Sequence, residues 1–167
     1  MQRERTDPQP QDERTALNDR LRFQRQTVRK KAEGLSEADA HRAFLPSPLM
    51  TIAGLVSHLR WNEHSWFEVS LLGLPNRGPW TANGHPDAEM MVDHVPLTQL
   101  LGEYDEQCAR SSEIADGLPL DAVEREAPSG GTACSLRWIL LHMIEETARH
   151  NGHLDIMREF ADGLTGE

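Results

Sequence analysis

Apolar side chains recur at steps of three and four residues in four separate stretches of the chain, which is the spacing of a helix with one buried face. Each stretch begins at a residue suited to a helix start and ends close to a glycine. In the first, Asp12 can cap a helix that carries Leu17, Leu21 and Val28 and ends at Gly34. The pattern predicts four long helices, over residues 12–34, 51–73, 96–117 and 135–162.

The segments between these helices contain no run in which β-branched or aromatic residues alternate with polar ones, so no strand is expected. Asn83-Gly84 is a hairpin-type dipeptide, but nothing strand-like flanks it. A capping box at residues 36–39 predicts one further short helical turn. We therefore expect an all-α four-helix bundle with long connections, formed by residues 12–167 as a single domain after a flexible tail of residues 1–11.

The connection between the second and third helices is unusually long. It runs over residues 73–95 and is rich in proline and glycine. Loops of this length in a compact domain are more often functional than idle. Its histidines His85 and His94 are candidates for a lid over a site, although most loop histidines have no such role. A second irregular stretch, residues 118–134, precedes the fourth helix.

The overall composition narrows the range of partners. The chain has a formal net charge of −10 and a pI near 5.2, which argues against nucleic acid and against an anionic membrane surface. It has no run of about 18 apolar residues and no N-terminal apolar segment of the signal-peptide kind, so a cytoplasmic protein without a membrane span is expected. Cys108 and Cys134 form no CxxC pair and predict neither a disulfide framework nor a thiolate metal site.

The fourth helix carries the strongest chemical signal. Its inward stripe is apolar at both ends and polar in the middle. In order, the stripe contains Ile139, Met143, Glu146, His150, His153 and Met157. A carboxylate that faces a core costs several kcal/mol unless it is paired, protonated or coordinated. Glu146 and His150 lie four residues apart and project from the same helix face, so a bound metal ion is the simplest compensation.

A third ligand has to come from another helix, and the second helix offers His58. His58 lies at the margin of the apolar face, whereas His64, six residues later, is expected to be exposed. Two imidazoles and a carboxylate form a normal catalytic zinc shell and also suit nickel or iron. From spacing alone, a metal site and a cluster of core histidines are equally good interpretations. A di-iron site would need two Glu-x-x-His motifs with further carboxylates, and the HExxH zincin motif is absent.

Three segments of the chain resemble the DinB/YfiT-like superfamily, in particular the branch related to mycothiol-dependent maleylpyruvate isomerase. They are GLS at residues 34–36, TIAGLVSHLRWNE at 51–63 with Trp66-Phe67 following, and SLRWILLHMIEETARHNGH at 135–153. The resemblance covers the chain from about residue 12 onward. It implies a four-helix bundle that binds one divalent metal, commonly zinc or nickel, and that often forms dimers.

Transferred to the matching positions, the resemblance implies His58, Glu146 and His150 as the metal ligands. His153 stands where other members often carry glutamine, which makes it a fourth ligand or a hydrogen-bonding neighbour. The resemblance also implies a low-molecular-weight thiol cofactor such as mycothiol or bacillithiol, whose thiolate attacks a small electrophile. The expected protein is a metal- and thiol-dependent transferase or isomerase that forms a homodimer.

Three further residues are assigned with alternatives, and a fourth, Cys108, with a single role. Asn62, one turn from His58, is a candidate for a hydrogen bond to a metal-bound water, or is a buried amide. Arg149 is a candidate for holding an anionic substrate, although a solvated salt bridge is the simpler explanation. Cys134 precedes a helix N-terminus, where a thiol pKa can fall, but it is more simply a small loop residue. Cys108 is expected to pack in the core.

Two other functions are open at the level of sequence. In one, the metal site is structural or sensing, and the protein acts by binding a partner or by dimerising. In the other, the protein is a hydrolase that uses a metal-bound water, with Glu63 or His153 as the base. The fold does not choose between these functions, because different sites occur on one shared fold. Thiol-dependent turnover of an electrophile would separate the transferase from both.

Overall fold

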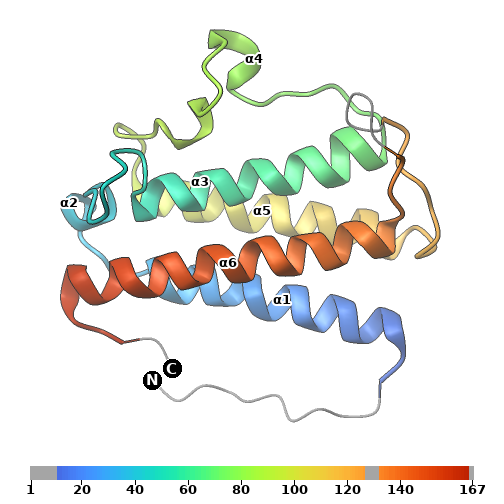
Figure 1. The fold of residues 1–167 in the computed structure, drawn as a ribbon, viewed down its shortest axis with the longest axis horizontal. Helices are drawn as coiled ribbons and strands as arrows, with labels where there is room; N and C mark the ends of the chain where they lie inside the picture. The colour runs from blue at the N-terminus through green and yellow to red at the C-terminus, as the bar shows by residue number, and fades with distance from the viewer. Residues whose placement is uncertain (1–10, 127–131, 166–167) are drawn as a thin grey trace.

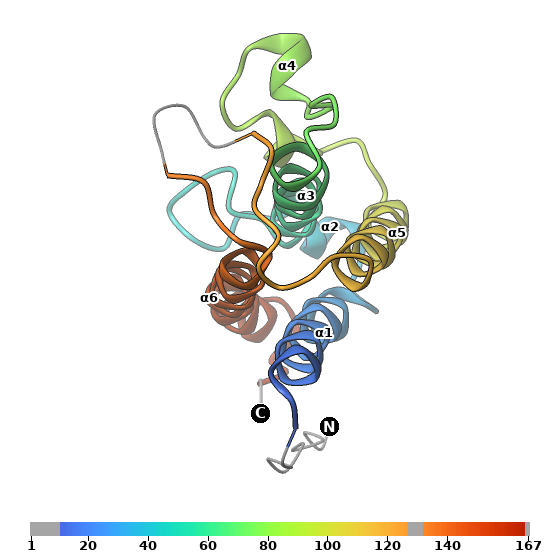
Figure 2. The ribbon, with the colours of Figure 1, turned by 90° about the vertical axis from the view of Figure 1, so that its right-hand side faces the viewer.

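Four long helical segments run side by side along the molecule (Figure 1) and are seen end-on in Figure 2. The computed structural model describes residues 11–126 and 132–165. The four segments are α1 (Glu13–Ala32), α3 (Ile52–Glu63) continued by the π-helix η1 (His64–Leu71), α5 (Leu97–Asp116) and α6 (Leu136–Asp162). The described residues contain no strand, only an isolated bridge between Val123 and Ser135. The predicted all-α class is confirmed.

The helix boundaries follow the predicted capping residues. The side chains of Asp12, Thr51 and Ser135 each accept a backbone N–H from the first turn of the helix that follows. Such caps satisfy N–H groups that have no partner inside the helix. Gly34 and Gly163 follow α1 and α6 with φ values of 78°, a backbone conformation that favours glycine. These boundaries are local in origin, which is why the sequence could predict them.

The second long segment departs from a regular α-helix. It begins after Thr51 as predicted but continues as a π-helix from His64 to Leu71. π-Helical turns are rare and frequently lie near functional sites. Apolar spacing over so few residues does not distinguish the two helix types, so the sequence did not predict this change. The segment ends before Gly73, whose φ of 67° turns the chain.

The four segments pack as two pairs. α1 lies along α6, and α3 lies along α5, with the most extensive contacts within each pair. The buried core falls into two clusters, one containing Leu55 and Tyr104 and the other containing Phe67 and Leu140. The seam between α3 and α6 and the seam between α1 and α5 have fewer contacts. Polar side chains can therefore occupy these two seams without disrupting the apolar core.

The connection over residues 73–95 lies over α3 and contains two short helical turns (Figure 1). They are α4 (Trp80–Asn83) and the 3₁₀ turn η2 (Ala88–Met90). The ring of Trp80 meets that of Trp61 on α3 edge-on, with centroids 5.9 Å apart. Ala88 is buried. These contacts place the connection against α3 rather than leaving it as a free loop.

Several smaller predictions can be compared with the structure. Ser36 accepts the N–H of Asp39 and starts the short helix α2 (Glu37–Ala40), as predicted. The helix predicted over residues 96–117 is α5, and Pro96 stands just before its first residue. The tail at residues 1–10 and the loop at residues 127–131 lie outside the described part of the chain. Among the helices of that part, none has the length and apolar character needed to cross a membrane.

Candidate metal centre

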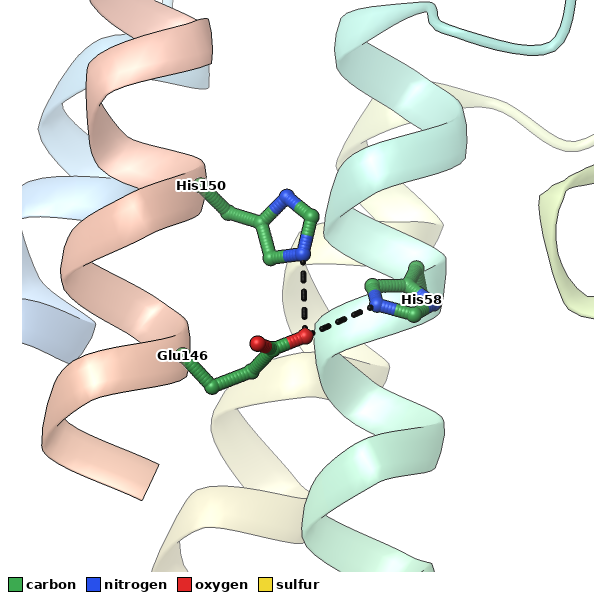
Figure 3. Close-up of side chains that lie close together, drawn as sticks. All are labelled: His58, Glu146 and His150. Atoms are coloured by element: carbon green, nitrogen blue, oxygen red, sulfur yellow. Dashed lines mark hydrogen bonds and ion pairs between the residues drawn. The ribbon is translucent and has the colours of Figure 1, made fainter. Parts of the chain in front are cut away.

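His58 of α3 meets Glu146 and His150 of α6 at the seam between these two helices (Figure 3). One potential ligand atom from each residue lies within 4.8 Å of the other two. Oε1 of Glu146 is 3.0 Å from Nε2 of His150 and 3.5 Å from Nε2 of His58. The structure thus brings together the three residues predicted as metal ligands.

The cluster is half-buried, and this burial affects its charge states. Side-chain exposure is 22% for His58, 16% for Glu146 and 12% for His150. Burial disfavours the ionised form of Glu146, but the neighbouring imidazoles of His150 and His58 outweigh burial and lower the pKa of the carboxyl. Burial, together with the imidazole of His58, lowers the pKa of His150. An anionic carboxylate and a neutral imidazole are the forms that bind a divalent metal.

Asn62 lies one turn from His58 on α3 and contacts two of the three candidate ligands. Its Nδ2 donates to Nε2 of His58 at 2.9 Å and to Oε1 of Glu146 at 3.4 Å. The residue is half-buried, so it is part of the seam rather than an amide enclosed in the core. Asn62 therefore hydrogen-bonds to two candidate ligand atoms, Nε2 of His58 and Oε1 of Glu146, which face each other across the cluster.

His153 and Arg149 lie at the edges of the cluster. The Nδ1 atoms of His153 and His150 are 3.4 Å apart, so His153 approaches the ring nitrogen of His150 that does not face Glu146. The side chain of Arg149 is 59% exposed and pairs with Glu145 at 3.0 Å, while lying 3.6 Å from Glu146. His153 thus contacts the candidate ligand His150 on the side away from Glu146, and Arg149 forms salt bridges beside the cluster.

Glu89 is a neighbour of the cluster that was not predicted from the sequence. It lies on η2, and its Oε1 is 3.3 Å from Nδ1 of His58. No sequence pattern marks it, because it stands in an irregular connection 31 residues away from His58. Through Glu89, the connection over residues 73–95 contacts the cluster. Neither His85 nor His94 belongs to the group of three ligands.

The α3–α6 seam continues from the cluster into a group of aromatic rings. Trp66 of η1 lies against His142 and Trp138 of α6, with ring centroids 4.7 Å and 5.4 Å apart. Trp66 follows Asn62 by four residues and His142 precedes Glu146 by four, so the rows on the two antiparallel helices are continuous. Trp138 is 44% exposed. An aromatic surface therefore adjoins the candidate metal centre.

His64 is buried, and the prediction that it is exposed is wrong. Only 1% of its surface is exposed. The 73–95 connection covers it, because the backbone N–H of Arg77 donates to its Nε2 at 3.2 Å. Its Nδ1 lies 3.6 Å from the buried carboxylate of Glu68. Burial lowers the pKa of His64, which favours the neutral imidazole. His64 does lie outside the group of candidate ligands on this helix, as expected. The sequence does not reveal that the 73–95 connection covers the side of the helix on which His64 lies.

Replacing His64 with alanine should leave the metal content unchanged, because His64 is not in the ligand group. The same change should lower the free energy of unfolding by about 1–3 kcal/mol, because it removes a buried ring that also accepts the N–H of Arg77. Elemental analysis and urea unfolding of the purified variant measure the two quantities. A clear loss of metal from a folded His64→Ala protein would mean that the ligand assignment on this helix is wrong.

Glu63 is unavailable as a general base, which removes one basis of the hydrolase interpretation. Its carboxylate is 1% exposed and accepts two hydrogen bonds from Arg25 of α1, at 2.8 Å and 2.6 Å. Because Glu63 directly follows Asn62, it projects from a different side of the helix, toward α1 and away from the α3–α6 seam.

A cleft lies in the second seam, between α1 and α5, and contains none of the cluster residues. Three arginines line it: Arg22, Arg25 and Arg29. Each already pairs with a carboxylate, in the order Asp19, Glu63 and Asp105. The three guanidinium groups of this cleft are therefore already paired with carboxylates of the same chain.

Neither cysteine lies in the cluster or is activated. Both thiols are unpaired. Burial and the nearby carboxylate of Glu124 raise the pKa of the Cys134 thiol, which is opposite to the effect expected from a helix N-terminus. Burial also raises the pKa of Cys108, which packs against the core as predicted. A reactive cysteine needs a lowered pKa, so neither residue is suited to act as the nucleophile.

The donor atoms of the cluster fit a divalent metal. Two imidazole nitrogens and one carboxylate oxygen leave coordination positions free, which is the pattern of catalytic rather than closed structural sites. The molecule is thus an all-helical protein with a candidate metal centre of two histidines and one glutamate. Residues 16–163 match the model of the mycothiol-S-transferase family, and the chain belongs to that family. The predicted resemblance to the mycothiol-related branch of the DinB/YfiT-like superfamily is confirmed. A comparison with curated proteins gave no match.

Proposed function

We propose that this protein is a divalent-metal-dependent mycothiol S-transferase. The observation that carries the proposal is the convergence of His58, Glu146 and His150 at the α3–α6 seam of a chain from the mycothiol-S-transferase family. Membership of the family supports the thiol, and the cluster supports the metal. Zinc is the proposed metal and nickel the alternative, because both accept a shell of two imidazoles and one carboxylate.

In a thiol transfer, the thiol loses its proton to solvent, the sulfur forms a bond to an electrophilic carbon, and the bond from that carbon to its leaving group breaks, so that the leaving group departs with the electron pair. A divalent metal held by the three ligands would supply a Lewis acid that lowers the pKa of the thiol. The raised pKa values of Cys134 and Cys108 support an external thiol as the nucleophile. The electrophile is proposed to be a small molecule that reaches the half-buried cluster from solvent.

The neighbours of the ligands have proposed roles of their own. Asn62 orients the carboxylate of Glu146 by donating a hydrogen bond to its Oε1, and it presents a polar amide to the reacting groups. His153 holds the ring of His150 through its Nδ1. Arg149 has an exposed guanidinium next to Glu146, and we assign to it the attraction of an anionic group on the substrate.

Thiol-dependent turnover tests the proposed function. Protein freed of metal with a chelator should not transfer mycothiol to a fluorogenic alkyl halide above the uncatalysed rate, and added Zn²⁺ should restore transfer. Glutathione in place of mycothiol controls for unspecific thiol chemistry, and the His58→Ala variant controls for free metal. If metal-loaded protein turns over no electrophile with mycothiol, the transferase proposal fails and a non-catalytic metal-binding protein becomes the better description.

We also propose that the protein is a cytoplasmic homodimer and that residues 12–167 act as one domain. The family match over residues 16–163 supports the single domain. Unpaired cysteines are usual in a reducing compartment, which supports the location. The superfamily resemblance supports the dimer. Light scattering on the purified protein measures its mass in solution and decides between dimer and monomer.

A further inference from the structure

Glu89 is a buried carboxylate with one recognisable partner, and that partner is a predicted metal ligand. Its Oε1 lies 3.3 Å from Nδ1 of His58, and its side chain is 11% exposed. Its other oxygen, Oε2, is buried and has no hydrogen-bond partner. In the described part of the chain, no lysine or arginine forms an ion pair with Glu89. Burying a carboxylate without compensation is costly. The contact with His58 is therefore the interaction that accounts for the buried position of Glu89.

The packing of the connection against α3 determines where Glu89 lies. Gly54 precedes His58 by four residues, so both stand on the same side of α3, one turn apart. A Cβ atom at Gly54 would come within 3.3 Å of the carbonyl oxygen of Met90 and 2.8 Å of that of Leu49. The absence of a side chain at Gly54 therefore lets η2 approach the helix closely. Glu89, in the middle of η2, then reaches the imidazole one turn further along.

We infer that Glu89 is a positioning residue for His58. Its carboxylate accepts the Nδ1–H of the imidazole and thereby selects the neutral tautomer whose Nε2 lone pair faces Glu146 and His150. A carboxylate behind a ligating histidine fixes the orientation of the ring and makes the ligand more basic. The inference rests on the proposed function, because it assigns Glu89 to the same metal centre.

Glu89 acts through His58 and is not itself a ligand. The two nitrogens of an imidazole ring point in different directions, and Glu89 contacts Nδ1 whereas Glu146 lies at Nε2. Glu89 is accordingly absent from the group whose ligand atoms lie within 4.8 Å of one another. The arrangement has a parallel at the second histidine, since His153 contacts Nδ1 of His150 while Nε2 faces Glu146.

Zinc affinity of the untagged, full-length protein tests this inference. Competition with a chromophoric chelator should show Zn²⁺ binding about 10–100-fold more weakly in Glu89→Ala than in the unaltered protein. Glu89→Gln should lose less, because its amide oxygen still accepts the Nδ1–H but carries no charge. The control is Asp87→Asn, which removes an exposed carboxylate of the same connection and should leave the affinity unchanged. Thermal unfolding of the metal-free variants confirms that each one folds.

The visible absorption spectrum of the Co²⁺-loaded proteins separates a positioning role from ligation. At saturating Co²⁺, Glu89→Ala should keep the spectrum of the unaltered protein, because the ligands are the same, whereas His150→Ala should change it. A Glu89→Ala spectrum altered like that of His150→Ala would overturn the positioning role. Equal zinc affinity in Glu89→Ala and the unaltered protein would also overturn it, while leaving the metal centre in place. If the unaltered protein binds neither zinc nor nickel, the proposed function fails as well.

Discussion

Replacement of His150 by alanine is expected to abolish stoichiometric retention of a divalent metal. The change removes one of the three proposed ligands and leaves Glu146 without the imidazole 3.0 Å from its Oε1. Two remaining ligands on two different helices make a weak site, because a catalytic zinc centre normally keeps three protein ligands. Elemental analysis of protein purified without an affinity tag should fall from about one metal ion per chain to a small fraction of that value.

His142→Ala is the matched control for this experiment. His142 lies two turns before His150 on α6, and its ring stacks on Trp138 with centroids 5.1 Å apart. It does not belong to the ligand group, so the variant should retain its metal. Full metal content in His150→Ala would show that the assigned ligands are wrong. Loss of metal from both variants would point to a general disturbance of α6.

The second large effect is expected in the core rather than at the metal centre. Glu63→Ala should lower the free energy of unfolding by about 3–5 kcal/mol, because it leaves the guanidinium of Arg25 buried without its counter-charge. Arg25 is 11% exposed and donates to both carboxylate oxygens of Glu63, and a third hydrogen bond joins it to Ser112. Urea unfolding at neutral pH, followed by circular dichroism, measures the change.

Two further variants identify the origin of this effect. Arg22→Ala removes an exposed arginine of α1, whose side chain is 65% exposed, and should cost less than about 1 kcal/mol. A double variant with Arg25→Met and Glu63→Leu should regain most of the stability lost in Glu63→Ala, because no uncompensated charge stays buried. A cost below about 1 kcal/mol for Glu63→Ala alone would contradict the buried ion pair.

Much of the fold could be predicted because its signals are local. Asp12, Thr51 and Ser135 cap helices through N–H groups only three residues away, and these contacts depend on no other part of the chain. The apolar spacing identified the four long segments for the same reason. The π-helix from His64 to Leu71 was not predictable in this way. It changes the backbone hydrogen bonds from residues four apart to residues five apart without a clear change in the apolar pattern.

The residues of the candidate site also differ in how far local sequence signals could predict them. Glu146 and His150 share one helix face, so their proximity follows from a spacing of four residues. Their polar character within an apolar stripe made them visible in the sequence. The partner His58 lies on another helix, and its selection depended on its place at the margin of an apolar face and on the family resemblance. The structure then placed the three within reach of one another.

The sequence by itself determined the helices, their caps, the family resemblance and the pair of candidate ligands on α6, because each follows from residues close together in the chain. Only the tertiary structure decided that His64 is covered, that Glu63 pairs with Arg25 and that Glu89 stands behind His58. These three facts depend on segments that are distant in sequence and meet only when the helices pack. Periodicity describes which side of a helix is buried, but packing alone decides what that side touches.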